Sequence, residues 1–180
     1  MTTLRSDAAL RREQILDAAD AVFAAHGITA PLDLVVAQAG VGRATLYRNF
    51  PERAALVEAL FDRALAQLEL EHGGADFFVL LEAVALRIVA APALADYWRA
   101  LDAVSTARGP GERIARLFRA PLAKAVRSGS CRADLKPADM PLVCGMLGAT
   151  LRGSSPARRR ALVKRTLDLL AAGVAAWPER

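Results

Sequence analysis

The amino-acid sequence predicts an all-α protein, and three observations support this fold class. Hydrophobic residues make up 54% of the 180 residues but aromatic residues only 6%, so Ala, Leu and Val supply most of the apolar content, and Ala and Leu favour helices over strands. Apolar side chains recur at helical spacing between breaks that are rich in Gly, Pro and Ser. No segment alternates apolar and polar residues for long enough to indicate a strand.

The first expected helix covers residues 7–26. Ser6 is expected to cap its N-terminus with its hydroxyl, and Gly27 is expected to end it. The apolar residues of this segment lie on one stripe at helical spacing, namely Ile15, Ala18, Ala19, Val22 and Phe23. This helix should therefore bury one face and leave its charged face in solvent.

A short second helix is expected over residues 32–39 and a third over residues 43–50. Pro31 suits the first turn of the second helix, where its missing N–H costs nothing, and Gly40 is expected to end that helix. The third helix should end by Phe50, because a proline biases the residue before it away from helical geometry.

A long fourth helix is expected over residues 52–71, before the Gly73-Gly74 break. Further helices are expected over residues 76–90, 94–107, 112–127, 138–152 and 156–176. Ser155 and Pro156 form a typical N-cap and first-turn pair for the last one. The sequence thus predicts two domains, residues 1–52 and residues 53–180.

The charge distribution points to a local basic surface rather than a basic N-terminal half. The chain has a formal net charge of +5 and a pI of about 9.9. Residues 1–65 hold seven Arg against eight Asp and Glu, whereas residues 66–180 hold 17 basic and 11 acidic residues. Between Leu34 and Pro51 there is no acidic residue, while Arg43 and Arg48 lie inside this stretch. Nucleic-acid binding needs positive charge only on the surface that meets phosphate.

Several other protein classes are not indicated by the sequence. No apolar run approaches the roughly 20 residues that span a bilayer, and the polar N-terminus lacks the apolar core of a signal peptide. Cys131 and Cys144 have no metal-ligand residues near them in the sequence. We expect both to be packing residues of a reduced, cytoplasmic protein that holds no metal and no cofactor.

The stretch AGVGRATLYRNF, residues 39–50, has two possible interpretations. A dinucleotide-binding loop of the G-x-G-x-x-G type requires a third glycine, but that position is Thr45. A phosphate-binding loop requires a Gly-Lys-Ser/Thr sequence, which does not follow. The nucleotide-loop interpretation is therefore disfavoured.

The alternative is a helix-turn-helix motif over residues 31–50. Gly40 would supply a left-handed turn, Val41 would fill the corner, and Leu46 would anchor the second helix of the motif. Leu32 and Val36 would face inward from the first. The residues then left on the outward arc, at the part of the helix that would enter a major groove, are Arg43, Ala44, Tyr47 and Arg48. Thr45 can donate to a phosphate or touch a thymine methyl. Arg and Thr contact phosphates and base edges, and a tyrosine hydroxyl contacts phosphate.

The run GITAPLDLVVAQAGVGRATLYRNFPERAALVEALF resembles the N-terminal DNA-binding domain of the TetR family of bacterial transcriptional regulators. The resemblance covers roughly residues 8–65. It includes the tract that ends in T-L-Y-x-x-F, a longer helix before it and a long helix directly after Phe-Pro. Three positions depart from the family's pattern: Thr29 precedes Ala30-Pro31 where the family has Thr at the helix start, Val36 replaces a small Ala, and Asn49 replaces an aromatic residue or His.

The resemblance implies how such a protein works. It implies a homodimer that sets two recognition helices into successive major grooves of a near-palindromic operator, acting as a repressor that a small-molecule effector releases. It further implies that Arg53 grips phosphate at the start of the fourth helix, and that Asn49 and Thr29 are additional DNA contacts. The C-terminal part would be a ligand-binding and dimerisation domain.

Candidate effector residues are the few aromatic side chains of the C-terminal part and their neighbours. They are Phe78, Leu81, Arg87, Tyr97, Trp98 and Phe118. Large rings among Ala and Leu leave irregular interiors of the kind that hold ligands, but it is equally open that they only fill a core. Arg87 and Arg116 interrupt apolar stretches. The favoured interpretation is that their long side chains extend to solvent, and the less favoured alternative is that they meet an acidic ligand or a buried Glu82.

Candidate dimer-interface residues lie on two stripes in the last two expected helices. The stripes contain Cys144, Leu147 and Leu151, and Val163, Leu167, Leu170, Val174 and Trp177. Two such helices from each chain would close into a four-helix bundle. The alternative is that these faces pack only inside the monomer.

An enzyme is not expected, because the chain has two histidines and no pattern of nucleophile, base and acid. The remaining alternative to a regulator is a helical protein-interaction adaptor that uses its basic C-terminal half on an acidic partner. Such an adaptor has no need for the RATLYR sequence of the predicted recognition helix.

Overall fold

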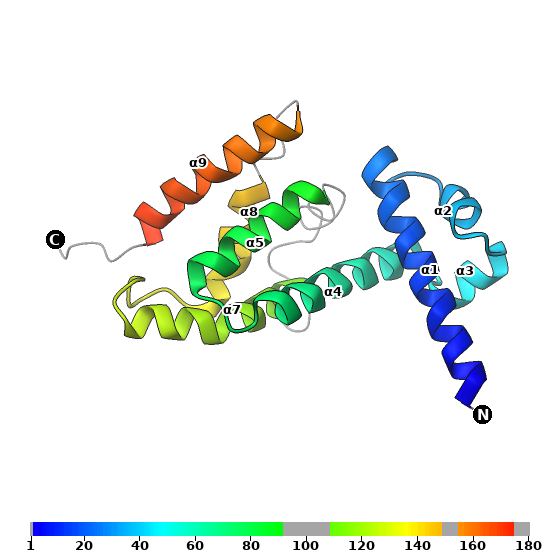
Figure 1. Ribbon diagram of the computed structural model, residues 1–180, viewed down its shortest axis with the longest axis horizontal. Coiled ribbons are helices and arrows are strands. Elements are labelled where there is room, and N and C mark those ends of the chain that lie inside the picture. The colour runs from blue at the N-terminus through cyan, green and yellow to red at the C-terminus, as the bar shows by residue number, and fades with distance from the viewer. Residues whose placement is uncertain (1, 92–108, 149–154, 175–180) are drawn as a thin grey trace. The chain divides into compact units, whose positions relative to one another are not determined.

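The computed structural model describes the backbone of residues 2–91, 109–148 and 155–174 (Figure 1). Its elements in chain order are α1 (Thr2–His26), α2 (Leu32–Ala39), α3 (Arg43–Asn49), α4 (Arg53–His72), α5 (Phe77–Ala90), α7 (Pro110–Arg127), the 3₁₀-helix η1 (Pro137–Asp139), α8 (Met140–Gly148) and α9 (Pro156–Val174). No strand occurs among these residues, and the prediction of an all-α fold is confirmed. The helix expected over residues 94–107 lies outside the described residues.

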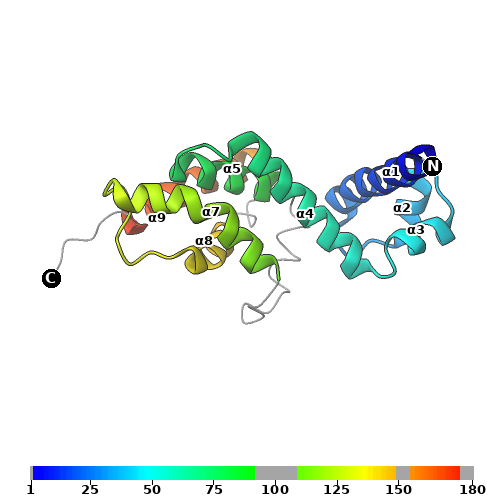
Figure 2. The ribbon, with the colours of Figure 1, turned by 90° about the horizontal axis from the view of Figure 1, so that it is seen from below.

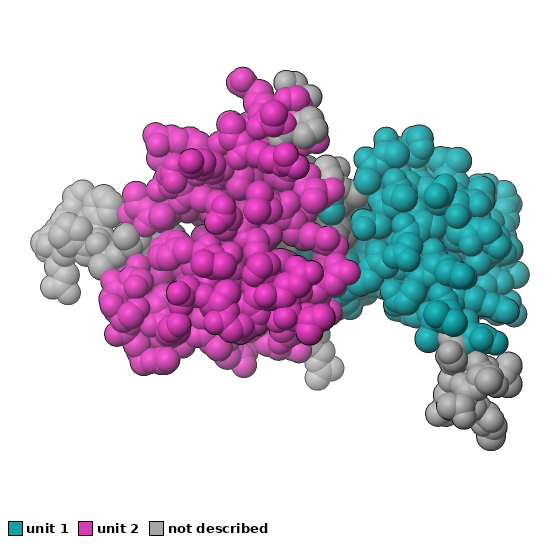
Figure 3. All heavy atoms as spheres, in the orientation of Figure 1, with its two compact units in different colours: residues 1–63, 91–97 teal, residues 64–90, 98–180 magenta. Residues whose placement is uncertain are grey.

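The described chain divides into two compact units, which meet in the sequence between Arg63 and Ala64 (Figure 3). The first unit consists mainly of residues 1–63. The second contains residues 64–90 and the described residues from 109 onward. Helix α4 contributes its first part to one unit and its second part to the other.

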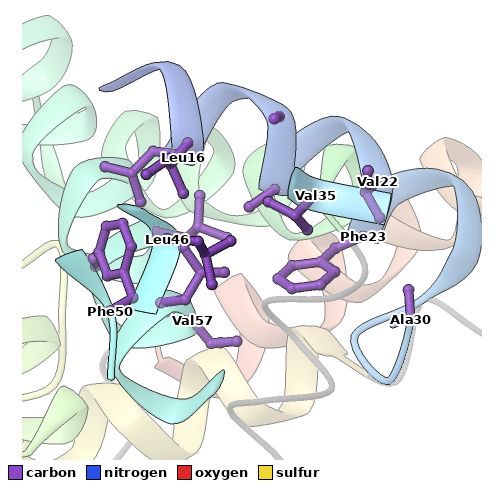
Figure 4. Close-up of a cluster of buried hydrophobic side chains, with 14 residues drawn as sticks. Leu16, Val22, Phe23, Ala30, Val35, Leu46, Phe50 and Val57 are labelled. Atoms are coloured by element: carbon purple, nitrogen blue, oxygen red, sulfur yellow. The ribbon is translucent and has the colours of Figure 1, made fainter. Parts of the chain in front are cut away.

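The first unit has a hydrophobic core to which α1, α2, α3 and α4 all contribute (Figure 4). The predicted stripe of α1 is buried, as shown by Ile15, Ala19 and Phe23, which are at most 3% exposed. At the end of α1, Gly27 adopts φ +81°, and its N–H donates to the Phe23 carbonyl at 2.9 Å. The expected end of the first helix is therefore confirmed.

The expected bounds of the second helix, residues 32–39, are confirmed by α2, but some other details of the expected helix starts are wrong. Helix α1 begins at Thr2, so Ser6 lies inside it and is not its N-cap, because no Gly or Pro interrupts the chain before it. Pro31 is the N-cap of α2 rather than part of its first turn. The helix expected from residue 138 begins as η1, and α8 starts only at Met140. Pro141 then falls in the first turn of α8, where its missing N–H costs no hydrogen bond.

The second unit is organised around α5, which contacts α7, α8 and α9 (Figure 2). Its sequence FFVLLEAVALRIVA is apolar over most of its circumference, as expected for a helix covered on several sides. Phe77 of α5 meets Phe118 of α7 edge to face, with ring centroids 5.8 Å apart. Both rings are at most 1% exposed, and together they form the centre of this core.

Both cysteines are free and buried in the second unit, so the expectation that they are packing residues is confirmed. Complete burial raises the pKa of Cys144 to about 12, which keeps its thiol protonated. Within the described ranges, no helix is both long and apolar enough to cross a membrane.

Candidate nucleic-acid interface

The turn between α2 and α3 is built on Gly40. This residue adopts φ +63° and ψ 28°, a left-handed conformation that costs glycine little and other residues more. A Cβ atom there would meet no atom within 4 Å, so backbone conformation, not space, favours glycine. The Val41 N–H donates to the Val36 carbonyl at 3.3 Å, which closes the turn. The geometry is that of a helix-turn-helix corner, as predicted.

The inner side of α3 is held by two side chains. Leu46 is fully buried and Phe50 is 2% exposed. In Figure 4, Leu46 points into the cluster that contains Val35 of α2 and Val57 of α4. The Arg12 guanidinium lies 4.7 Å from the centroid of the Phe50 ring and covers its outer side. Helix α3 therefore has one fixed orientation relative to α1, α2 and the start of α4.

The residue that α2 buries completely is Val35, which the sequence interpretation did not single out. Leu32 and Val36 were expected to face inward, but they are only half-buried and pack against the edge of the core. On a helical wheel Val35 lies about 60° from Leu32, on the side away from Val36. The i, i+3 relation between Leu32 and Val35 was therefore the available signal.

The outward arc of α3 is exposed to solvent as predicted. Arg43, Ala44, Tyr47 and Arg48 are exposed, while Thr45 and Asn49 are half-buried. The Tyr47 side chain is 48% exposed although it is large and partly apolar. The seven-residue helix thus separates a buried Leu46 side from a side that carries two arginines and a phenol.

Thr45 is the hydrogen-bonding centre of α3. Arg48 Nη2 donates to Thr45 Oγ1 at 3.2 Å, and Asn49 Nδ2 donates to the Thr45 carbonyl at 2.8 Å. The Arg48 guanidinium therefore contacts a neutral hydroxyl one turn earlier in the helix, and this partner does not offset its positive charge. The Asn49 amide is engaged within the helix, a local role that the sequence interpretation did not anticipate.

Arg43 has a different partner. Its Nη2 atom lies 2.5 Å from Oδ2 of Asp33, which is in the first turn of α2. Both side chains remain more than half exposed. The sequence interpretation missed Asp33, because ten residues separate it from Arg43 and no periodicity connects two different helices.

Arg53 does not simply project into solvent. It is half-buried, its Nη1 atom donates to the Ile28 carbonyl at 2.7 Å, and its guanidinium lies 5.7 Å from the Phe23 ring centroid. The start of α4 is thereby joined to the segment between α1 and α2. Thr29, the residue after this carbonyl, is exposed.

A second arginine joins α4 to α1. Arg63 Nη1 donates to Asp17 Oδ1 at 2.6 Å and lies 3.5 Å from Glu13 Oε2, while Nη2 donates to the Leu16 carbonyl at 3.3 Å. The Arg63 side chain is only 18% exposed. These contacts of Arg63, which sequence spacing did not reveal, fix the first part of α4 to α1 within the helix-turn-helix unit.

The structure separates the effector candidates into different environments. Leu81 and Phe118 are core residues, whereas Phe78 is 36% exposed and packs on Phe77 with ring centroids 5.1 Å apart. Arg87 Nη2 donates to Gln67 Oε1 at 2.8 Å. Tyr97 and Trp98 lie outside the described residues.

The less favoured alternative for Arg87 and Arg116, contact with a buried Glu82, is wrong. Glu82 and Arg116 are both exposed. One turn of helix α5 carries both apolar and polar positions, and Glu82 falls on the side that no other described helix covers.

Three of the dimer candidates are buried inside the single chain. Cys144, Leu147 and Val163 are at most 2% exposed, so they pack within the monomer. Leu167 and Leu170 are half-buried. Leu151 and Trp177, together with the side chain of Val174, lie outside the described residues.

Different apolar side chains of α8 and α9 face outward. They are Leu142, 69% exposed, Met146, 43% exposed, and Leu169, 57% exposed. Both helices carry two apolar stripes, and sequence periodicity alone did not tell which stripe faces the protein's own core.

Comparisons with known proteins agree with this geometry. The family model for bacterial regulatory proteins of the tetR family matches residues 15–60, which include α2, the turn and α3. The HTH-type transcriptional repressor LfrR of Mycolicibacterium smegmatis is 53% identical over 49 residues. That alignment spans 27% of this chain and only 25% of LfrR.

Solved structures match over nearly the whole chain. The TetR transcriptional regulator SCO0520 from Streptomyces coelicolor is 32% identical, with a TM-score of 0.59, and the match covers 92% of this chain and 98% of that one. A TetR transcription regulatory protein from Mycobacterium vanbaalenii is 30% identical, with a TM-score of 0.60 and coverage of 96% and 99%. With its helix-turn-helix unit and its all-α architecture, the chain belongs to the TetR family of transcriptional regulators.

Proposed function

We propose that this regulator is a homodimeric repressor that binds a near-palindromic operator and is released from it by a small-molecule effector. The observation that carries the proposal is that the short helix α3 exposes Arg43, Tyr47 and Arg48 while it buries Leu46. A short helix held rigidly from one side, with long polar side chains on the other, suits insertion into a major groove. The DNA-binding domain is proposed to comprise residues 1–52.

The proposed DNA contacts divide by chemistry. Arg48 and the Tyr47 hydroxyl contact phosphate, Arg43 reads a base edge, and Ala44 and Thr45 lie against thymine methyls. Asn49, Arg53 and Thr29 are proposed as contacts at the margin of the interface. Arg53 retains guanidinium N–H groups besides the one that donates to Ile28.

Dimerisation is proposed to use the outward stripes of α8 and α9. In α8 these are Leu142 and Met146, four residues apart. In α9 the positions at helical spacing that remain exposed or half-buried are Leu162, Thr166, Leu169 and Gly173. Small residues on this stripe would let two α9 helices approach closely, and the exposed leucines would be buried by the partner.

Effector release is proposed to act through α4, whose residues belong to both compact units. Arg53 and Arg63 join its first part to the helix-turn-helix unit, so a displacement of α4 would displace the recognition helix as well. An effector shifts the population only if it binds the DNA-incompetent state more tightly. Among the candidate effector residues that the structure describes, Phe78 and Arg87 of α5 are not part of the buried core.

Leu169→Glu is expected to convert a dimer into a monomer, because it would place a charge in an apolar interface. The dissociation constant of the dimer should rise at least about tenfold, the equivalent of roughly 1.4 kcal/mol. Sedimentation equilibrium over a range of concentrations measures it. Val163→Ala serves as control, since this buried side chain should affect stability but not association; a dimer that survives Leu169→Glu unchanged would contradict the proposed interface.

Arg48→Ala is expected to weaken DNA binding about tenfold, because one phosphate contact is lost per recognition helix. The salt dependence of log Kd should become shallower by about 0.9 for each contact removed. The measurement is a titration of the full chain against the DNA upstream of its own gene, with excess nonspecific competitor and at two salt concentrations. Arg119→Ala, an exposed arginine of α7, should change Kd less than about twofold.

The outcomes separate the two functions considered. Saturable binding that resists competitor and weakens in Arg48→Ala supports the regulator. If the upstream DNA binds only weakly, a selection of fragments from the whole genome tests for an operator elsewhere. Failure of that selection as well would overturn the proposed function and favour an adaptor that uses the basic second unit.

A further inference from the structure

We propose that Asp33 is a positioning residue that raises the sequence specificity of DNA binding. By pairing with Arg43, it keeps this arginine from binding the phosphates of nonspecific DNA. The inference rests on the proposed DNA-binding function of α3. It assigns a role to a carboxylate of α2 that neither the family motif nor the outward arc of α3 includes.

The geometry places an acid inside an otherwise basic surface. Asp33 is the only acidic residue between Asp20 and Glu52 in the sequence. Its Oδ2 atom lies 2.5 Å from Nη2 of Arg43, the first residue of α3, and the two side chains are 57% and 69% exposed. The pair joins the two helices of the motif, and Arg48 of the second helix is exposed as well.

Stability does not account for this ion pair. Exposed ion pairs contribute little to folding, because solvent screens them and both side chains lose conformational freedom. The helix-turn-helix unit is already held by the buried Leu46 and Val35. A carboxylate beside a recognition helix also repels the phosphates that the helix must approach. The position of Asp33 is therefore better explained by what it does to Arg43.

The two arginines of α3 differ in their partners. Arg48 donates to the neutral hydroxyl of Thr45, so its whole charge remains available to phosphate. The positive charge of Arg43 is neutralised by the carboxylate of Asp33. Of the two arginines of α3, only Arg48 therefore presents a charge that no acidic side chain of the described residues neutralises. A nonspecific complex, which depends on charge alone, gains little from a compensated arginine.

Arg43 can still read a base while it is paired. A guanidinium has five N–H donors, and the contact to Asp33 uses Nη2. The remaining donors can form the paired hydrogen bonds that arginine makes with O6 and N7 of guanine. Because Asp33 already restricts the side chain, less conformational freedom is lost when the right base is present.

The first arm of the test uses nonspecific DNA, namely a fluorescein-labelled 30-base-pair duplex of random sequence. Full-length wild type, Asp33→Asn and the control Asp7→Asn are titrated by fluorescence anisotropy between 50 and 200 mM NaCl. Asp7 is exposed on α1, so its substitution makes the same change in net charge at another site of the first unit. For Asp33→Asn, the slope of log Kd against log salt concentration should increase by about 0.9 per recognition helix. At the lowest salt concentration, Kd should fall about 3-fold. Asp7→Asn should stay within 1.5-fold of wild type.

The second arm uses a duplex that the wild-type protein itself enriches from a random-sequence library. Asp33→Asn should lower the ratio of specific to nonspecific affinity about 5- to 10-fold, with the loss concentrated at one base pair per half-site. The same substitution is then made in an Arg43→Ala background. In that background, Asp33→Asn should change the ratio of specific to nonspecific affinity no more than Asp7→Asn does, because the Arg43 guanidinium that Asp33 positions is absent.

The outcomes distinguish the inference from the function on which it rests. If wild type enriches no sequence, the proposed function fails. If wild type enriches a site but Asp33→Asn keeps its salt dependence and specificity ratio, the inference about Asp33 is overturned and the function stands. An equal effect of Asp33→Asn with and without Arg43 would also overturn it, since the carboxylate would then act only as a general charge. Asp33→Ala is measured in the same two arms. It shows whether an effect of Asp33→Asn comes from loss of the carboxylate or from a new contact made by the asparagine amide.

Discussion

Phe50→Ala is expected to lower the free energy of unfolding of the first unit by about 3–5 kcal/mol, because it removes a ring that is almost completely buried and leaves a cavity. The substitution also removes the surface on which the Arg12 guanidinium lies. Since Phe50 holds the end of α3 against α1 and α4, specific DNA binding should be lost together with the stability of this unit. Hydrogen exchange of the α1 and α3 amides reports this free energy separately from that of the second unit.

Tyr47→Ala is the matched control for Phe50→Ala. Tyr47 is an aromatic residue of the same helix but is 48% exposed, so its removal should cost less than about 1 kcal/mol of stability. DNA binding should nevertheless weaken, because a proposed phosphate contact is lost. If the two variants lost equal stability, the assignment of Phe50 to the core and Tyr47 to the outward arc would be wrong.

Phe118→Ala is expected to destabilise the second unit by about 3–5 kcal/mol. Its ring is fully buried, and it meets the Phe77 ring edge to face at 5.8 Å. No other side chain can fill the resulting space without a shift of α5 against α7. The measurement is urea denaturation followed by circular dichroism, with hydrogen exchange of the α5 and α7 amides to locate the loss.

The control for Phe118→Ala is Phe78→Ala, which removes a ring that packs on Phe77 but is 36% exposed. We expect a loss below about 1.5 kcal/mol for this variant, because about a third of the Phe78 side chain already contacts solvent and water can enter the space that its removal leaves. The comparison also tests which aromatic residues can serve the effector. If Phe118→Ala left stability unchanged, the ring would line a cavity rather than fill the core, and its original assignment as an effector residue would regain support.

Much of the helix-turn-helix unit could be predicted from the sequence, because its determinants are local. The bounds of α2 follow from Pro31 and Gly40, and the left-handed turn follows from the glycine itself. The inward position of Leu46 follows from the helical period. These features depend on residues within a few positions of one another, so periodicity and turn chemistry were sufficient.

The dimer stripe of α9 shows where local patterns fail. The stripe through Val163 and Leu167 was expected at the partner surface, but Val163 is buried in the chain's own core. Leu169, which lies on a different face of the same helix, is exposed instead. Both stripes have helical spacing and similar apolar content, and the choice between them depends on where α5 and α8 lie.

By itself the sequence determined the helical class, the corner at Gly40 and the set of side chains that α3 turns outward, because backbone propensity and the 3.6-residue period act over one or two turns. Only the tertiary structure decided which partner each charged side chain takes. Arg43 pairs with Asp33 across ten residues, Arg53 with the Ile28 carbonyl across 25, and Arg63 with Asp17 across 46. The physical reason is that such pairs form when separate helices are brought together by burial of their apolar faces, which bears no fixed relation to distance along the chain.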